Sequence, residues 1–177
     1  MKKNPLEIQH LTSAGFAAAP FEKVILPLGS LESHGGHLPF GTDAMTAHLV
    51  ALDIAARVPR TAVLPPLNYG VSEHYKDFPF TISVSFETEI AFLRDIFESI
   101  HREGIRKVFV MNGHDGNISP IEVAGRSAWT RSRSPRPTWR PASPSAPPSW
   151  SAPASRPRSR GCAPSAPTRS SRSSSPA

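Results

Sequence analysis

The sequence predicts an α/β fold in which a mostly parallel sheet is covered on both faces. Three apolar runs, 23–28, 61–64 and 107–111, have the length and composition of buried strands. Between them, 44–57 is rich in Ala and Leu, and 87–102 carries an apolar stripe at helical spacing. Strands that alternate with helices build a parallel sheet between two helical layers.

Capping and alternation signals place the remaining elements. Asn4–Pro5 can start a short helix, because Pro is favoured at the first helical position. Thr42 or Asp43 can cap the helix that runs from residue 44. Alternation over 81–85 predicts a fourth strand, and a last helix is expected to begin near 117–120.

A ligand-rich loop follows the first predicted strand. Within twelve residues it holds Glu32, His34, His37 and Asp43, separated by glycines and a proline that exclude a helix. Carboxylate oxygen and imidazole nitrogen together suit zinc, manganese or iron. Open α/β sheets bind their ligands at the carboxyl ends of their strands, which is where this loop lies.

Two further polar loops also follow predicted strands. The loop 68–79 contains Glu73 and His74, and the loop 112–117 contains His114. The carboxyl ends of neighbouring parallel strands meet at one edge of a sheet. We therefore expect the loop with Glu32 and the loop with His114 to meet, although they are far apart in sequence.

The last third has a different composition. All 14 acidic residues and 11 of the 20 Lys and Arg lie in 1–126, which carries a formal charge of −3. Residues 127–177 contain nine Arg and no acidic residue, so they carry +9. With 15 Ser and 11 Pro in 51 residues, this segment cannot build a core. We expect a domain over 1–126 and a disordered tail over 127–177.

Two origins of the tail stay open. Arg, Pro, Ser and Ala are what GC-rich codons yield out of frame, so we hypothesise a shifted reading frame from about residue 126. Translating the same DNA in its other frames tests this. The alternative is a native Arg-rich tail that binds RNA or other phosphates. The mildly acidic domain itself shows no basic stripe, so nucleic acid is not its expected partner.

Cysteine content and hydropathy restrict the kinds of cross-link, metal site and membrane segment that the chain can form. One cysteine, Cys162, excludes an intrachain disulfide and a Cys-based zinc site. No stretch approaches the roughly 18 apolar residues of a membrane helix, and the amino terminus lacks an apolar signal core. We expect a cytoplasmic protein without a membrane partner.

The motifs resemble those of the creatininase (creatinine amidohydrolase) family. Gly-Ser-Leu-Glu-Ser-His-Gly-Gly-His-Leu-Pro-Phe-Gly-Thr-Asp at 29–43 and Asn-Gly-His-Asp-Gly-Asn at 112–117 carry the resemblance, and 70–74 and 78–83 also fit. The resemblance covers about 1–126. It implies a Rossmann-like three-layer sandwich, here incomplete at its C-terminal side, and hexameric assembly.

The resemblance also implies a role for individual residues. Glu32 and His114 would bind one divalent metal, His34 would bind a second, and Asp43 would bridge them. The two ions would be Zn, Mn or Fe, and the reaction would be hydrolysis of an amide C–N bond in a small substrate, cyclic ones included. Glu73 and His74 are the catalytic candidates for proton transfer, with surface polarity as the alternative.

The remaining candidates would contact the substrate. They are His37, Asn112 and Gly113, for which loop hydrogen bonding or turn formation is the competing interpretation. One position departs from the family, because creatinine-hydrolysing members carry a carboxylate for the second metal where this chain has Gly116. An inactive, truncated family remnant is therefore the alternative to an enzyme.

Overall fold

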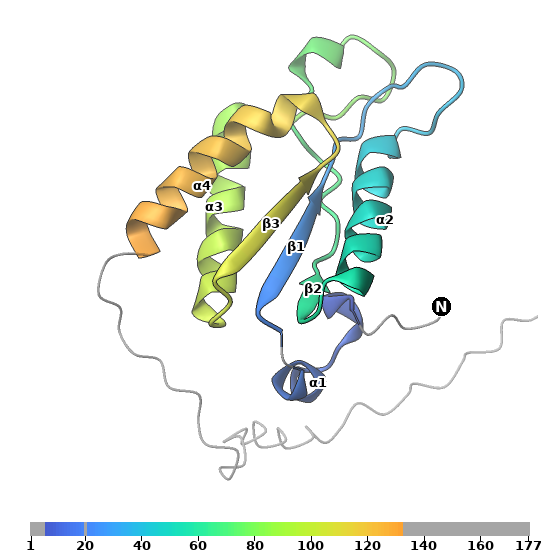
Figure 1. Cartoon of the computed structure of the whole chain (residues 1–177). Coiled ribbons are helices and arrows are strands. Elements are labelled where there is room, and N and C mark those ends of the chain that lie inside the picture. The colour runs from blue at the N-terminus through green and yellow to red at the C-terminus, as the bar shows by residue number, and fades with distance from the viewer. Residues whose placement is uncertain (1–5, 20, 133–177) are drawn as a thin grey trace, which may run out of the picture. The chain divides into compact units, whose positions relative to one another are not determined.

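The computed structural model describes residues 6–19 and 21–132, with side chains through residue 128. Three strands form one parallel sheet in the order β2-β1-β3. The strands are β1 (Lys23–Leu28), β2 (Thr61–Val63) and β3 (Lys107–Asn112). Helix α2 (Thr42–Arg57) covers one face, and helices α3 (Phe86–Arg102) and α4 (Ile118–Ser132) lie together on the other (Figure 1). The predicted three-layer α/β sandwich is confirmed.

The register of the sheet makes the polar loops after β1 and β3 begin side by side at the same edge of the sheet. Along β1 and β3, Lys23 lies opposite Lys107 and Leu28 lies opposite Asn112. The amide of Gly113 then donates to the carbonyl of Leu28 at 2.8 Å, so the pairing extends one residue past β3. The chains that follow β1 and β3 therefore leave the sheet side by side.

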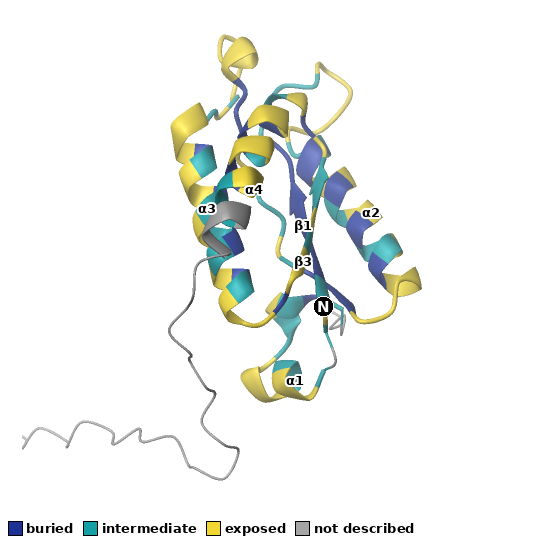
Figure 2. Cartoon of the chain, turned by 60° about the vertical axis from the view of Figure 1, so that its left-hand side comes forward, coloured by how far each residue is buried: buried dark blue, intermediate teal, exposed yellow. Residues whose placement is uncertain are grey.

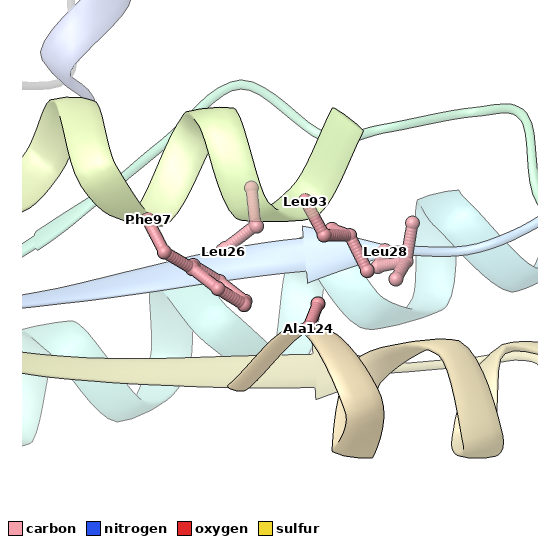
Figure 3. Packing of buried hydrophobic residues seen from close by; sticks show 5 residues of the cluster. All are labelled: Leu26, Leu28, Leu93, Phe97 and Ala124. Carbon is pink, nitrogen blue, oxygen red and sulfur yellow. The ribbon is translucent and has the colours of Figure 1, made fainter. Parts of the chain in front are cut away.

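The core lies mainly between the sheet and the α3–α4 layer. Leu93 and Phe97 of α3 point toward Leu26 and Leu28 of β1, and Ala124 of α4 closes the cluster (Figure 3). On the other face, small side chains of α2, among them Ala51 and Ala55, pack closely on β1. Burial of apolar surface is the main force that holds the two layers on the sheet. It contributes about 25 cal/mol of stabilising free energy per Å² of apolar surface removed from water.

Several local predictions need correction. A 3-10 helix at Ile8–His10 and helix α1 (Ser13–Ala18), capped by Thr12, replace a single helix from Asn4–Pro5, whose own residues lie outside the described part. The expected strand 81–85 is reduced to two isolated bridges, at Ile82 and Ser83. These residues run along loops rather than along a sheet edge, so no continuous ladder forms.

Two element boundaries also differ from the prediction. Helix α2 begins at Thr42 after Gly41, and neither Thr42 nor Asp43 caps it, because the Asp43 side chain turns toward His34. Helix α4 continues to Ser132, six residues beyond the expected end of the domain at residue 126. The tail prediction for 133–177 falls outside the described residues and stays a prediction.

Strand β3 is more exposed than a buried strand. Lys107 and Phe109 are exposed and the other four residues of β3 are half-buried, whereas β1 is buried from Val24 onward, as the dark blue of Figure 2 shows. The reason is position: among the described residues β3 is an edge strand, and only β1 pairs with it.

In the described part of the chain, no helix is long and apolar enough to cross a bilayer.

Candidate metal centre

Four of the predicted metal ligands meet at the carboxyl ends of β1 and β3. Ligand atoms of Glu32, Asp43 and His114 all lie within 4.8 Å of one another, and all three residues are buried. His34 joins them, because its Nε2 lies 2.9 Å from Oδ1 of Asp43. The loop after β1 supplies Glu32 and His34, the first turn of α2 supplies Asp43, and the loop after β3 supplies His114.

Both histidines are held with one nitrogen free to face the carboxylates. Nδ1 of His34 lies 3.1 Å from the carbonyl of Glu32, and Nε2 of His114 lies 2.9 Å from the carbonyl of Val71. A ring nitrogen beside a carbonyl carries the proton and donates it, so the opposite nitrogen keeps its lone pair. In His114 that nitrogen is Nδ1, which lies 3.2 Å from Oδ2 of Asp43 and 3.3 Å from Oε1 of Glu32.

The carboxylates carry buried oxygens that accept no hydrogen bond from any described residue. These atoms are Oε2 of Glu32 and Oδ2 of Asp43. A buried carboxylate oxygen without a hydrogen bond costs substantial free energy unless it is neutralised. Two carboxylates and two imidazole nitrogens that converge on one volume match the donor set of zinc, manganese or iron. The residues present therefore fit a divalent metal.

The negative charges of Asp43 and Glu32 also favour the binding of a cation at His34. Burial alone would lower the pKa of His34, but its hydrogen bonds to the Glu32 carbonyl and the Asp43 carboxylate raise the pKa overall, assisted by the charges of both carboxylates. Protons therefore compete with a metal for Nε2 of His34, and metal binding at this residue weakens as the pH falls.

A buried amide joins the three loops that form the site. The side chain of Asn117, which is inaccessible to solvent, donates to the carbonyl of Gly29 at 3.0 Å and accepts from the amide of Val71 at 3.0 Å. The loops after β1, β2 and β3 are thereby tied to one residue. From the sequence, Asn117 was only the last residue of the polar loop 112–117, and its position directly before the expected helix was the sole signal of this role.

The other predicted site residues lie at different distances from the cluster. The ring of His74 stacks on the ring of His114, with centroids 6.2 Å apart and planes inclined by 12°. Glu73 instead pairs with Lys76 at the surface, at 3.3 Å, and His37 is exposed in its loop. Thus the structure brings His74 to the metal centre, but not Glu73.

Asn112 and Gly113 contact the chain itself. The Asn112 side chain donates to the carbonyl of His114 at 2.7 Å and accepts from its amide at 3.2 Å, which fixes the turn that presents His114. A Cβ at Gly113 would lie 2.4 Å from the carbonyl oxygen of Asp43. These contacts favour the turn-forming interpretation, and a role in substrate binding stays a prediction.

Glu89 is a buried carboxyl group near the site that sequence analysis missed. It lies on α3, is 2% exposed, and neither of its oxygens has a hydrogen bond partner. Burial raises the pKa of Glu89 to about 7. The signal was present in the helical spacing, because Glu89 precedes Leu93 and Phe97 on the same buried stripe.

Replacement of Glu89 by Gln should change how stability depends on pH in metal-free protein. With the pKa raised from 4.5 to about 7, the folded state keeps a proton that the unfolded state has released, so stability is lost as the pH rises through this window. Glu89→Gln removes this loss. Urea unfolding should show the variant to be similar to the parent at pH 4.5 and more stable at pH 8.

Glu87→Gln is the matched control, since Glu87 lies exposed in the same first turn of α3. Identical pH dependence in the parent and in Glu89→Gln would contradict the raised pKa.

Comparisons with known proteins agree with this geometry. The family model for creatinine amidohydrolase matches residues 9–163, a range that runs past the end of the resemblance expected from the motifs. The mycofactocin precursor peptide peptidase of Mycolicibacterium smegmatis is 38% identical over 106 residues, which cover 57% of this chain and 42% of that protein. The creatinine amidohydrolase of Pseudomonas putida is 33% identical over 112 residues, covering 58% and 43%.

Solved structures of creatininase are also similar. A manganese form and a Zn–Zn form of a variant each give a TM-score of 0.67 at 29% identity, covering 72% of this chain and 52% of theirs. The chain thus spans less than half the length of these two curated relatives. The family model matches well over half of the sequence, and the fold agrees with the solved creatininase structures: the chain belongs to the creatininase family.

Proposed function

We propose that the chain carries the metal-binding part of a hydrolase that cleaves amide C–N bonds in small substrates, cyclic amides included. The observation that supports this most directly is the buried cluster itself, in which Nδ1 of His114 lies 3.2 Å from Oδ2 of Asp43 and 3.3 Å from Oε1 of Glu32. Among the described residues, Oδ2 of Asp43 and Oε2 of Glu32 accept no hydrogen bond. The relatives named as creatinine amidohydrolase and as a peptide peptidase both act on C–N bonds by name. Homo-oligomers, cytoplasmic location and the identity of the metal belong to the same proposal.

Each ligand would have a separate task. Glu32, Nδ1 of His114 and Oδ2 of Asp43 would hold one divalent ion, while Nε2 of His34 and Oδ1 of Asp43 would hold a second. When bound, such ions supply a hydroxide at neutral pH and polarise the amide carbonyl. The carbonyls of Glu32 and Val71 keep the two imidazoles in the required tautomers. The exposed ring of His74, stacked on His114, is placed to give a proton to the departing nitrogen.

The experiment is metal analysis of the folded full-length chain, followed by a hydrolysis assay. We expect at least one equivalent of zinc or manganese per chain, because three buried ligands already converge. Release of amine or ammonia from a panel of small linear and cyclic amides should require that metal. A folded chain that takes up no divalent metal would overturn the proposal.

A catalytically inactive remnant is the second candidate. It is favoured by one observation: the second metal has only His34 and the bridging Asp43 among the described residues. Bound metal without hydrolysis of any amide in the panel would support this candidate. The proposal that the Arg-rich tail over 127–177 binds RNA rests mainly on residues outside the described part, and equal RNA affinity with and without 127–177 would contradict it.

A further inference from the structure

We propose that the aromatic side chains of the turn 78–81 form a binding subsite for an aromatic ring that a substrate carries next to its scissile amide. Tyr75 and Phe40, whose rings contact those of the turn, would extend this subsite. The inference rests on the proposed function, because it assigns the substrate class of that same metal centre. It does not depend on the number or the identity of the bound ions.

The first observation is a continuous series of ring contacts that leads from the metal centre to the surface. The ring of His74 stacks on the ring of His114, which is 5% exposed, with centroids 6.2 Å apart. The Tyr75 ring lies 4.7 Å from the His74 ring, and the Phe78 ring lies 6.0 Å from the Tyr75 ring, measured between centroids. Phe78 is 53% exposed. Aromatic surface thus extends from a candidate metal ligand to solvent.

The second observation is the backbone conformation of Phe80. The amide of Thr81 donates to the carbonyl of Phe78 at 3.4 Å, which closes a turn. Inside this turn Phe80 has a φ of 58°, in the left-handed region that suits glycine and is unfavourable for a bulky side chain. The ring gains no burial in return, since Phe80 is 70% exposed. Fold stability does not explain a phenyl group at this position, and strained residues of this kind gather at ligand sites.

The third observation is that a second aromatic ring meets Phe80 from the loop that carries the metal ligands. The rings of Phe40 and Phe80 have centroids 5.7 Å apart and planes inclined by 46°. The carbonyl of Phe40 accepts from the amide of Glu32 at 3.2 Å, so its backbone is bonded directly to a candidate metal ligand. The hydroxyl of Thr81 accepts from the amide of Ser33 at 3.2 Å, which ties the turn to the same stretch. Both rings are therefore held on backbone that is bonded to the ligand loop.

Four aromatic side chains of these two loops lie outside the hydrophobic core. They are Phe40, Tyr75, Phe78 and Phe80. Each is at least 38% exposed, and the buried clusters of the described residues include none of them. Aromatic rings attract a further aromatic ring by offset or edge-to-face contact, beyond the effect of the area that they bury. Because His74 connects these rings to His114, we assign the occupant as part of the substrate rather than as a partner protein.

The test compares two amides that differ in the aromaticity of one ring. N-acetylphenylalaninamide carries a phenyl ring, and N-acetylcyclohexylalaninamide carries a saturated ring of similar size. Titration of each probe into the full-length chain, followed by saturation-transfer NMR, should show that the phenyl probe binds about fivefold more tightly. Equal affinities, or no binding of either probe, would overturn the subsite.

Matched variants assign the preference to the ring of Phe80. Phe80→Ala should lower the affinity for the phenyl probe about fivefold. Phe92→Ala should leave it unchanged, since Phe92 is 52% exposed but lies on α3, outside the two loops. Phe80→Gly should lose the same affinity with a urea midpoint at or above that of the parent, because glycine also relieves the backbone strain. Equal effects of the two Ala variants, or loss of stability together with affinity in Phe80→Gly, would overturn the proposal.

Metal uptake by the same samples separates failure of this inference from failure of the proposed function. A chain that binds metal but shows no preference for the phenyl probe would overturn the subsite alone. A chain that prefers the phenyl probe but takes up no metal would overturn the proposed function and leave the ring-binding subsite supported. Light scattering tests the other occupant. Self-association that Phe80→Ala abolishes would assign the turn to an interface between copies and overturn the subsite.

Discussion

Asp43→Ala should abolish stoichiometric metal binding. Asp43 faces His34 through Oδ1 and His114 through Oδ2, so its loss removes a ligand from both expected ions at once. Partners that only orient metal ligands are worth about 10–100-fold in affinity, so a direct bridging ligand should be worth more than about 100-fold. Titration of zinc or manganese into the metal-free chain, followed by calorimetry, measures this.

The control for this variant lies on the same helix. Asp53 is an exposed carboxylate of α2 that pairs with Arg57 at 2.8 Å. Asp53→Ala removes the same charge from α2 without touching the cluster, so it should bind metal as the parent does. Full retention of metal in Asp43→Ala, or equal loss in both variants, would disprove the assignment of Asp43 as a bridging ligand.

Gly29→Ala should have the largest effect on stability. A Cβ at Gly29 would lie 2.2 Å from the amide nitrogen and 2.5 Å from the Cα of Ala44, and both are backbone atoms of α2. Relief of that overlap requires α2 to move away from the end of β1, where Ala44 is buried. We expect a loss of about 3 kcal/mol of unfolding free energy, which is a large share of the total for a small domain.

Gly36→Ala provides the matched comparison for Gly29→Ala. Nothing lies within 4 Å of a Cβ built on Gly36, in the same loop. Urea unfolding of the metal-free proteins should show Gly36→Ala within about 0.5 kcal/mol of the parent. Similar midpoints for the two variants would mean that the contact between Gly29 and Ala44 does not limit how α2 packs.

The cluster of candidate metal ligands could be predicted because most of its members belong to one stretch of the sequence. Glu32, His34 and Asp43 stand in one glycine-rich loop, and the rule that ligands gather at strand ends brings His114 to them. The structure confirms that the four residues meet. The tautomers of the two histidines could not be predicted, because they depend on the carbonyls of Glu32 and Val71, and the fold alone places those atoms.

Elements that depend on tertiary context were predicted less well. The alternation at 81–85 has the period of a strand, but those residues find only isolated bridge partners. The run at 107–111 is apolar after Lys107, yet Phe109 is exposed because no described segment lies beyond β3. Periodicity describes what a segment can bury, whereas neighbours determine what it does bury.

The amide side chain of Asn117 has a consequence for the order of folding and binding. Because it bonds to both Gly29 and Val71, no one of the three site loops can detach without breaking bonds to the others. Local opening of the site should therefore cost more than the opening of an ordinary surface loop, and the buried amide of Val71 should exchange with solvent more slowly than the amides of the exposed residues after it. A metal ion would meet a preformed site, so little of its binding energy is consumed in ordering the loops.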